Sequence, residues 1–419
     1  MITQTQLFPG VTLHCRTDRR FKQNTLSVQF CRETRDEEAA LNALLPAVLL
    51  RGCEKYPDMR AITLHLDDLY GAGMSSLVRV VGNYHITGIG CSFIEDRFAM
   101  SGDQVLAPLT EFLYQLLRQP YTEKGVFSRE YVESERKNLL AAIDSRKNDK
   151  RAYATDRLMD LLCGNDPFAI PRLGRRQQVE AVTAEKLWAH YEKVLTESPV
   201  ELFYVGSRAP EEVAELVKPL FEGLCRKVQS LPPQTLLNAA ALCDLEEEME
   251  VSQGRLSMAF VSPVNMDHSL FIPAQVFAIL YGGSTGKLFN VIREQLSLCY
   301  DIGGVYYKTK GFMAVYAGID FDKKEQVRQE VGRLLVDCCE GRITEAELSA
   351  AKQTLIASLQ ASQDSPGAIE SYYMNGLLTG CSIDPDAYIR AVRQVTAQQV
   401  QQAAALFKCN TVYFLKGVQ

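Results

Sequence analysis

The chain has 419 residues, of which 47% are hydrophobic and 23% charged, a composition typical of a soluble globular protein with two or three domains. Its net charge of −6 argues against nucleic acid as a partner. It contains no apolar run long enough to span a membrane, and its first residues lack the basic and apolar regions of a leader peptide. We therefore expect a cytoplasmic protein that no membrane anchors.

The twelve cysteines are scattered, and none forms a C-x-x-C pair, which argues against a zinc ribbon or a thioredoxin-type site. Several lie inside apolar runs, among them Cys15, Cys91 and Cys163. We expect reduced and largely buried thiols, as is usual in the cytoplasm.

Hydrophobic periodicity predicts a mixture of strands and helices along the first half of the chain. Strands are predicted over 10–16, 24–31 and 199–205, with a hairpin of strands 75–81 and 84–93 around the turn pair Gly82-Asn83. Apolar residues at helical spacing predict helices over 37–50, 58–70, 103–118, 124–147, 150–163, 182–196 and 211–221. Residues 226–238, with two prolines and little periodicity, predict an extended linker.

The second half of the chain repeats the first. Three short segments recur at an offset of 230 or 231 residues: 23–30 at 253–260, 47–52 at 278–283, and 69–70 at 299–300. Such a period predicts two copies of one unit. We therefore expect an α+β protein with two homologous domains, 1–225 and 246–419, joined by a linker over 226–245. Each domain is expected to have an antiparallel-rich sheet with helices packed on one face.

Residues 41–57, LNALLPAVLLRGCEKYP, predict an amphipathic helix that ends in a glycine turn. The stretch resembles the zinc helix of the pitrilysin/insulysin-type (inverzincin) metallopeptidases, in which a His-x-x-Glu-His motif precedes a Gly, a small residue, a Glu/Lys pair, Tyr and Pro. Counting back from Gly52 places Ala43 and Ala47 at the two histidine positions and Pro46 at the glutamate position. Two histidines four residues apart on a helix can bind one zinc ion, and the glutamate can polarise its water, but alanine and proline offer neither ligand nor base.

The third zinc ligand of that family, a glutamate further along the chain, is also missing. The matching stretch is Glu135-Arg-Lys-Asn-Leu-Leu-Ala-Ala-Ile143, in which Ala141 and Ala142 stand at the acidic positions. Glu135 remains, and we expect it to be a charge on a helix surface. The next stretch, residues 162–168, keeps the pattern of the family. The five histidines are far apart in the sequence, so we predict no metal site in this chain, the alternative being one rebuilt from distant residues.

Residues 280–300 form the second candidate constellation. Their Gly-Lys pair suggests a phosphate-binding loop, but Tyr281 stands where the first loop glycine belongs, and Leu288 replaces the Ser or Thr that would hold magnesium. From the residues alone, the segment is interpreted as a helix start with Ser284 or Thr285 as cap.

The same segment resembles the second-domain signature of the pitrilysin-type peptidases, a Gly-Gly turn followed by Leu-Phe, Arg-Glu and Leu-x-Tyr. Arg293 and Tyr300 match its two polar positions. In active members these residues reach the zinc-bearing domain and hydrogen-bond the substrate near the scissile carbonyl, so the resemblance implies that Arg293 and Tyr300 bind substrate. The alternative is a structural role, with the arginine in a salt bridge at the edge of the core and the tyrosine buried.

The resemblance covers residues 10–415 and implies a duplicated α/β roll. It points to the non-catalytic member of paired bacterial pitrilysin-type proteins, which lacks the zinc motif. Such a subunit pairs with an active, zinc-bearing homologue as a heterodimer, or self-associates as a homodimer, and closes a chamber around a peptide or protein segment, with zinc held only by the partner. The alternative is a scaffold or binding protein of the same fold with no proteolytic role. A self-sufficient hydrolase is a third interpretation, which no Gly-x-Ser-x-Gly or other nucleophile motif supports.

Overall fold

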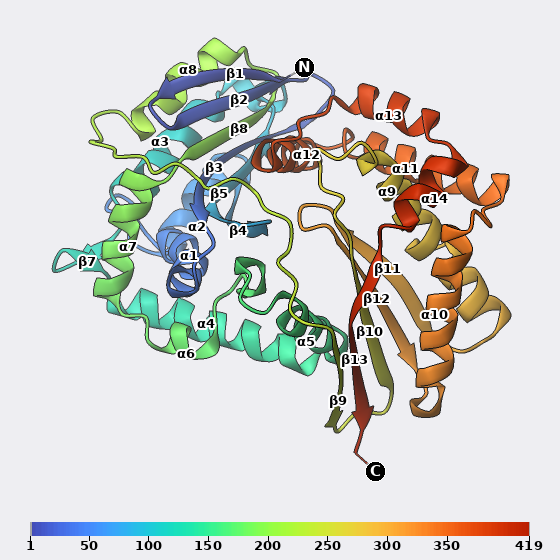
Figure 1. The fold of residues 1–419 in the computed structure, drawn as a ribbon. Helices are drawn as coiled ribbons and strands as arrows, with labels where there is room; N and C mark the ends of the chain where they lie inside the picture. The colour runs from blue at the N-terminus through green and yellow to red at the C-terminus, as the bar shows by residue number, and fades with distance from the viewer. Residues whose placement is uncertain (1, 419) are drawn as a thin grey trace. The chain divides into compact units, whose positions relative to one another are not determined.

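The computed structural model describes residues 2–418, which form two compact units (Figure 1). The first unit contains residues 2–143, 170–233 and 363–375, and the second contains residues 144–169, 234–362 and 376–418. Residues 224–242, where a linker is predicted, carry no helix or strand. Within residues 2–418, none of the helices is both long and apolar enough to cross a membrane.

Six strands of the first unit form one sheet in the order β1-β2-β8-β3-β5-β4. They are β1 (Thr3–Phe8), β2 (Val11–Thr17), β3 (Gln23–Glu33), β4 (Gly73–Val81), β5 (Tyr84–Ile94) and β8 (Val200–Gly206). Neighbouring strands are antiparallel except β2 and β8, which run parallel. The predicted hairpin between β4 and β5 turns at Gly82, whose φ of 57° favours glycine.

The sheet of the second unit repeats this arrangement. Its strands pair in the order β11-β12-β10-β13-β9. They are β9 (Cys243–Met249), β10 (Gly254–Val261), β11 (Asp301–Tyr307), β12 (Phe312–Ile319) and β13 (Lys408–Gly417). In sheet order, β11, β12, β10, β13 and β9 correspond to β4, β5, β3, β8 and β2. This match reproduces every pairing, including the parallel pair of β13 and β9. The predicted duplication is therefore confirmed, and so is the α+β fold with antiparallel-rich sheets.

Helices of the first unit cover its sheet. They are α1 (Asp36–Leu49), α2 (Met59–Asp68), α3 (Leu106–Arg118), α6 (Arg176–Glu180), α7 (Ala184–Glu197) and α8 (Pro210–Val217), with α4 (Arg129–Asn148) beginning in this unit and ending in the other. α1 packs on β4 and β5, and its apolar side chains join Leu26, Val28 and Ile89 of the strands in one core. The second unit contains α9 (Phe271–Gly282), a π-helix (Leu288–Gln295), α10 (Lys324–Cys339), α11 (Glu345–Ala361), α13 (Pro385–Gln394) and α14 (Ala397–Ala404).

Two further helices, α5 (Lys150–Cys163) and α12 (Pro366–Thr379), follow α4 and α11 and occupy matching places in the two copies. Each packs in the unit that is built mainly from the other half of the chain (Figure 1). α5 packs on β10 and β13. In α12, Glu370 accepts hydrogen bonds from Gln29 Nε2 at 2.8 Å and from Arg79 Nη2 at 2.9 Å, both from the first sheet. The two copies thus exchange one helix each.

This exchange changes the predicted layering of the second sheet. Alternate residues of a strand point to opposite faces. Tyr307 of β11 packs in the cluster that contains α5. Gly304 lies three residues earlier in the same strand and therefore on the other face, where it approaches Gly282 of α9. Helices therefore cover both faces of this sheet rather than one, because a helix from before the linker supplies the second layer.

The first half also contains elements for which we predicted no strand. β1 precedes the first predicted strand, and the two-residue strands β6 (Thr122–Glu123) and β7 (Val126–Phe127) lie near the predicted start of the helix over 124–147. They form a tight hairpin through Lys124 and Gly125, which have φ of 56° and 81°. α4 consequently begins at Arg129.

Candidate functional site

The positions of the zinc helix lie on α1 and offer no metal-binding atom. Ala43 is 6% exposed, Pro46 is buried and Ala47 is half-buried. The glycine turn that follows is retained for packing, because a Cβ on Gly52 would lie only 2.4 Å from the carbonyl oxygen of Pro57. The helix and its turn are therefore kept, and the side chains on it serve the core.

Pro46 removes one hydrogen bond from α1, and a strand replaces it. In a regular helix the N–H of residue 46 would donate to the carbonyl of Asn42, but proline has no N–H. The hydroxyl of Thr87, in β5, donates to that carbonyl oxygen at 2.7 Å instead. Asn42 and Thr87 are both buried, so this bond satisfies a carbonyl that would otherwise be buried without a partner.

Two histidines that are far apart in the sequence meet at the side chain of Asn42. His190 Nε2 lies 2.8 Å from Oδ1 of Asn42, and His85 Nδ1 lies 3.4 Å from its Nδ2. Because an amide accepts on oxygen and donates from nitrogen, this arrangement assigns a proton to His190 Nε2 and leaves His85 Nδ1 as an acceptor. Burial lowers the pKa of both rings to about 4, so both are neutral at pH 7. Among the described residues, Nε2 of His85 has no hydrogen-bond partner.

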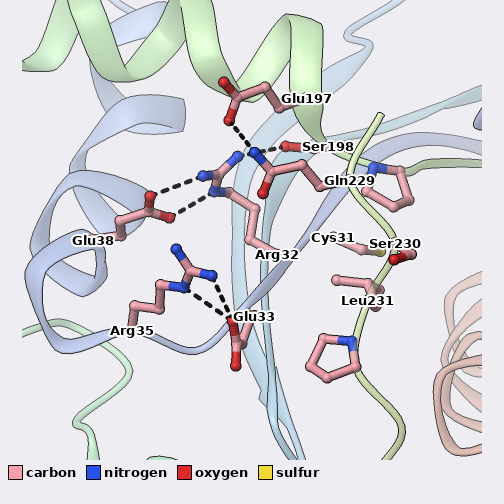
Figure 2. Close-up of a pocket in the computed structure, with 12 residues that line it drawn as sticks. Cys31, Arg32, Glu33, Arg35, Glu38, Glu197, Ser198, Gln229, Ser230 and Leu231 are labelled. Atoms are coloured by element: carbon pink, nitrogen blue, oxygen red, sulfur yellow. Dashed lines mark hydrogen bonds and ion pairs between the residues drawn. The ribbon is translucent and has the colours of Figure 1, made fainter. Parts of the chain in front are cut away.

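A small polar hollow lies between β3, α1, the end of α7 and residues 229–232 (Figure 2). Arg32 donates to both carboxylate oxygens of Glu38, at 2.7 and 2.8 Å, and to Ser198 Oγ at 3.1 Å. Burial raises the pKa of the Glu38 carboxyl, but the hydrogen bond to Arg32 and the charges of Arg32 and Arg35 act together against burial and leave that pKa below its usual value. Arg35 donates from Nε and Nη2 to one carboxylate oxygen of Glu33, at 3.0 and 2.8 Å. Each arginine is thus paired with a carboxylate within the chain. The pair of Arg32 and Glu38 fixes the start of α1 to β3.

Glu135 does not lie free on the helix surface as predicted. Its Oε1 accepts a hydrogen bond from Arg51 Nη1 at 3.2 Å, and its side chain is 14% exposed. Arg51 is the second residue after the end of α1, so the pair fixes the end of this helix to α4. The prediction was wrong because the two residues are 84 positions apart in the sequence. Ala142, at the lost ligand position further along α4, is exposed.

Arg293 and Tyr300 lie on the surface of the second unit. The Arg293 side chain is 44% exposed, lies over the ring of Phe289 at 4.9 Å and has the carboxylate of its neighbour Glu294 at 3.8 Å. Tyr300 is 59% exposed, and its hydroxyl donates to Asp320 Oδ1 at 2.8 Å, which raises the pKa of the phenol. The alternative with a buried tyrosine is therefore wrong.

The Gly-Gly turn before Arg293 is required by close packing. A Cβ on Gly282, in α9, would lie 2.7 Å from the Cα of Gly304 in β11. The helix that follows is a π-helix over Leu288–Gln295, and its N-cap residue is Lys287 rather than the predicted Ser284 or Thr285. π-helical turns are uncommon and are often found at functional sites.

Comparison with known proteins shows what this chain is similar to. The family described as "Peptidase M16 inactive domain" matches residues 181–355. Over 411 residues, 98% of this chain and 96% of the relative, the sequence is 24% identical to "Probable inactive metalloprotease YmfF" of Bacillus subtilis (strain 168). The chain is therefore similar to inactive members of the M16 peptidases over almost its whole length. Among solved structures, a conserved protein from Enterococcus faecalis V583 has a TM-score of 0.91 at 27% identity and covers 100% of this chain and 99% of its own. The M16 inactive domain from Pseudomonas fluorescens has the same fold, with a TM-score of 0.82 at 15% identity over 100% and 98% of the two chains.

The M16 metallopeptidases imply a zinc ion, and the residues of this chain do not fit one. Its ligand and base positions are Ala43, Pro46, Ala47 and Ala142, none of which has a donor atom in its side chain. Within residues 2–418, no three His, Cys, Asp or Glu side chains gather closely enough to hold a metal ion. The M16 zinc chemistry therefore has no ligand set here.

The M16 frame also contains contacts that our sequence analysis missed. Asn42 joins His85 and His190, and Arg51 joins Glu135, although both sets come from distant parts of the chain. The available signal was a polar asparagine on the apolar side of a predicted helix, since a buried amide needs hydrogen-bond partners.

Proposed function

We propose that this M16 homologue is a non-catalytic subunit that pairs with an active, zinc-bearing homologue and completes a chamber in which a peptide or an extended protein segment is processed. One contrast carries the proposal. The zinc-helix positions hold alanine and proline within α1, whereas Arg293 and Tyr300 are 44% and 59% exposed. A tyrosine kept only for packing is expected to be largely buried.

The chemistry follows from these two side chains. Arg293 offers a charged fork to a carbonyl or carboxylate of the substrate, and Tyr300 offers a phenol to the oxyanion that develops at the scissile carbonyl. The partner supplies zinc and the general base and carries out the hydrolysis. We propose the cytoplasm as the compartment, with neither nucleic acid nor a membrane as partner.

The test measures zinc content and peptide hydrolysis in three samples: this protein, a zinc-motif homologue from the same organism, and the two mixed. We expect zinc in the homologue only and full hydrolysis only in the mixture. Full activity of the homologue alone contradicts the proposal. Stoichiometric zinc and hydrolysis in this chain alone would reveal a rebuilt site. Light scattering on the eluting species distinguishes a heterodimer from a homodimer of this chain.

Variants of the exposed pair test the role of the residues. Arg293→Ala and Tyr300→Phe are expected to lower turnover by the mixture roughly a hundredfold, the size of effect seen when one oxyanion donor is removed. Assembly and thermal stability should be unchanged. Arg390→Ala, in α13, is the matched control because Arg390 is an exposed arginine of the same unit.

The second candidate is a scaffold or binding protein without a proteolytic role. The hydrogen bond between Tyr300 and Asp320 favours it, because it gives the phenol a partner within the chain. Under this alternative the same variants lower the melting temperature or weaken assembly, and no mixture hydrolyses peptide.

A further inference from the structure

Two neighbouring loops of the first unit present the same pair of side chains. In the loop between β2 and β3, the Arg20 guanidinium lies 5.1 Å from the ring centroid of Phe21, and after β5 that of Arg97 lies 4.8 Å from the ring centroid of Phe98. The loops are joined, since Arg97 Nη2 donates to the carbonyl oxygen of Arg19 at 2.8 Å. They form one built surface rather than two independent turns.

An apolar hollow of about 590 Å³ lies in this surface. It is lined by Phe21, Lys22, Gln23, Ile94, Phe98 and Pro366, all within the first unit. At its margin Phe98 is 47% exposed, and nearby Met100 is 71% exposed. Exposed large apolar side chains that gather around a hollow are typical of binding surfaces.

Lys22 lines the hollow, and further basic residues lie in the two loops that form it, in a protein whose net charge is −6. Residues 16–22, RTDRRFK, contain four basic residues and one acidic residue. The acidic residue, Asp18, is engaged by Arg20 at 2.8 Å. Among the described residues, Arg19, Lys22 and Arg97 form no ion pair, and all three are exposed. Their charge is therefore available to a ligand.

We propose that this surface, defined by Arg19, Lys22, Arg97, Phe21 and Phe98, binds an acidic peptide segment that carries a bulky apolar side chain. The apolar side chain enters the hollow, and neighbouring carboxylates pair with the cations around it. Buried apolar anchors supply most of the affinity in such contacts, and complementary charge supplies orientation and specificity. The concave shape favours a peptide side chain over a flat membrane surface. The site goes beyond the proposed role of Arg293 and Tyr300, which lie in the other unit.

The experiment uses the full-length protein and a fluorescein-labelled nonapeptide in which phenylalanine and leucine are flanked by glutamates, with binding measured by anisotropy. Arg19→Glu combined with Lys22→Glu removes the cations, and Phe98→Ala removes one wall of the hollow. We expect each change to weaken binding roughly tenfold or more. Arg60→Glu, on α2, reverses an exposed charge that does not line the hollow and should leave binding unchanged.

Peptide variants and vesicles complete the test. Replacing the phenylalanine of the peptide by alanine, or its glutamates by lysines, is expected to reduce affinity to a similar extent. Equal binding by all protein variants, or no binding at millimolar peptide, overturns the proposal. A third outcome also overturns the proposal: the protein cosediments with phosphatidylserine vesicles, the double variant does not, and no peptide binds. That result would assign the surface to a membrane. Circular dichroism melts verify that each variant is folded.

Discussion

The hydroxyl of Thr87 donates to the carbonyl oxygen of Asn42 at 2.7 Å, at the one place in α1 where Pro46 prevents the helix from making that bond itself. Pro46, at the position of the catalytic base in M16 peptidases, therefore does more than remove a carboxylate. Proline there removes a main-chain hydrogen bond, and a threonine on β5 supplies a substitute.

Thr87→Val should lower the free energy of unfolding by about 1–3 kcal/mol, because it leaves the buried carbonyl of Asn42 without a donor. In a Pro46→Ala background the new N–H can donate to that carbonyl, so the same change should cost less than half as much. Urea unfolding of the four proteins measures the coupling as a double-mutant cycle. An identical effect of Thr87→Val in both backgrounds would show that the hydroxyl does not compensate for the proline.

The buried histidines should make stability fall as the pH is lowered from neutral. The pKa of His85 and His190 is about 4 in the folded protein, compared with 6.5 as the ordinary value. Below about pH 6.5 the unfolded chain binds protons that the folded protein does not, so the free energy of unfolding decreases by up to about 1.4 kcal/mol per pH unit for each ring, until the folded rings are protonated near pH 4.

Urea unfolding between pH 7.5 and 5 measures this slope. His190→Gln keeps a donor for Asn42 Oδ1 and should remove about half of the decrease that the two rings cause. Glu38 stays ionised throughout this pH range because its pKa lies below its usual value, so its protonation does not contribute to the slope. An unaltered slope in the variant would assign the pH dependence to other groups.

Gly282 should resist a substitution that usually strengthens a helix. Alanine in place of a helical glycine normally stabilises by about 0.5–1 kcal/mol. Here the added methyl group would meet the backbone of Gly304 at 2.7 Å, so Gly282→Ala should destabilise by about 1–3 kcal/mol. Gly332→Ala in α10 is the matched control, since nothing lies within 4 Å of its added Cβ, and it should stabilise. Stabilisation by both changes would contradict the close approach of α9 and β11.

The phenol of Tyr300 should titrate at a lower pH when the charge of Asp320 is removed. The carboxylate accepts the only proton of the phenol and raises its pKa, so Asp320→Asn should return that pKa towards the usual value near 10. Carbon-13 NMR of ring-labelled tyrosine follows the titration, with Tyr300→Phe identifying the signal. An unshifted signal in the Asp320→Asn protein means that the contact does not persist in solution.

The sequence predicted the fold well because the signals were local or repeated. The glycine turn at Gly82, the helix before the turn at Gly52 and the offset of 230 residues all depend on residues that are close in the chain or occur twice. These patterns sufficed to predict an α+β duplication, and the sheet orders of the two units confirm it.

What the sequence could not predict depends on contacts between distant segments. Helical periodicity does not distinguish the π-helix around Arg293 from an α-helix, and nothing local to Glu135 indicates that Arg51 will reach it. The meeting of His85 and His190 at Asn42 likewise required the sheet and α7 to be placed first. The roles of Arg293 and Tyr300 in substrate binding remain predictions.

The exchange of α5 and α12 also has a consequence for synthesis of the protein on the ribosome. Gln29 and Arg79 are translated early, yet Glu370, which accepts a hydrogen bond from each, emerges only after nearly nine-tenths of the chain has been made. We therefore expect the nascent first sheet to lack this hydrogen-bond partner until late in synthesis, so that the two halves do not mature one after the other as separate domains commonly do. A chain that stops after the linker would lack α12, so we expect its first unit to be less stable than in the whole protein.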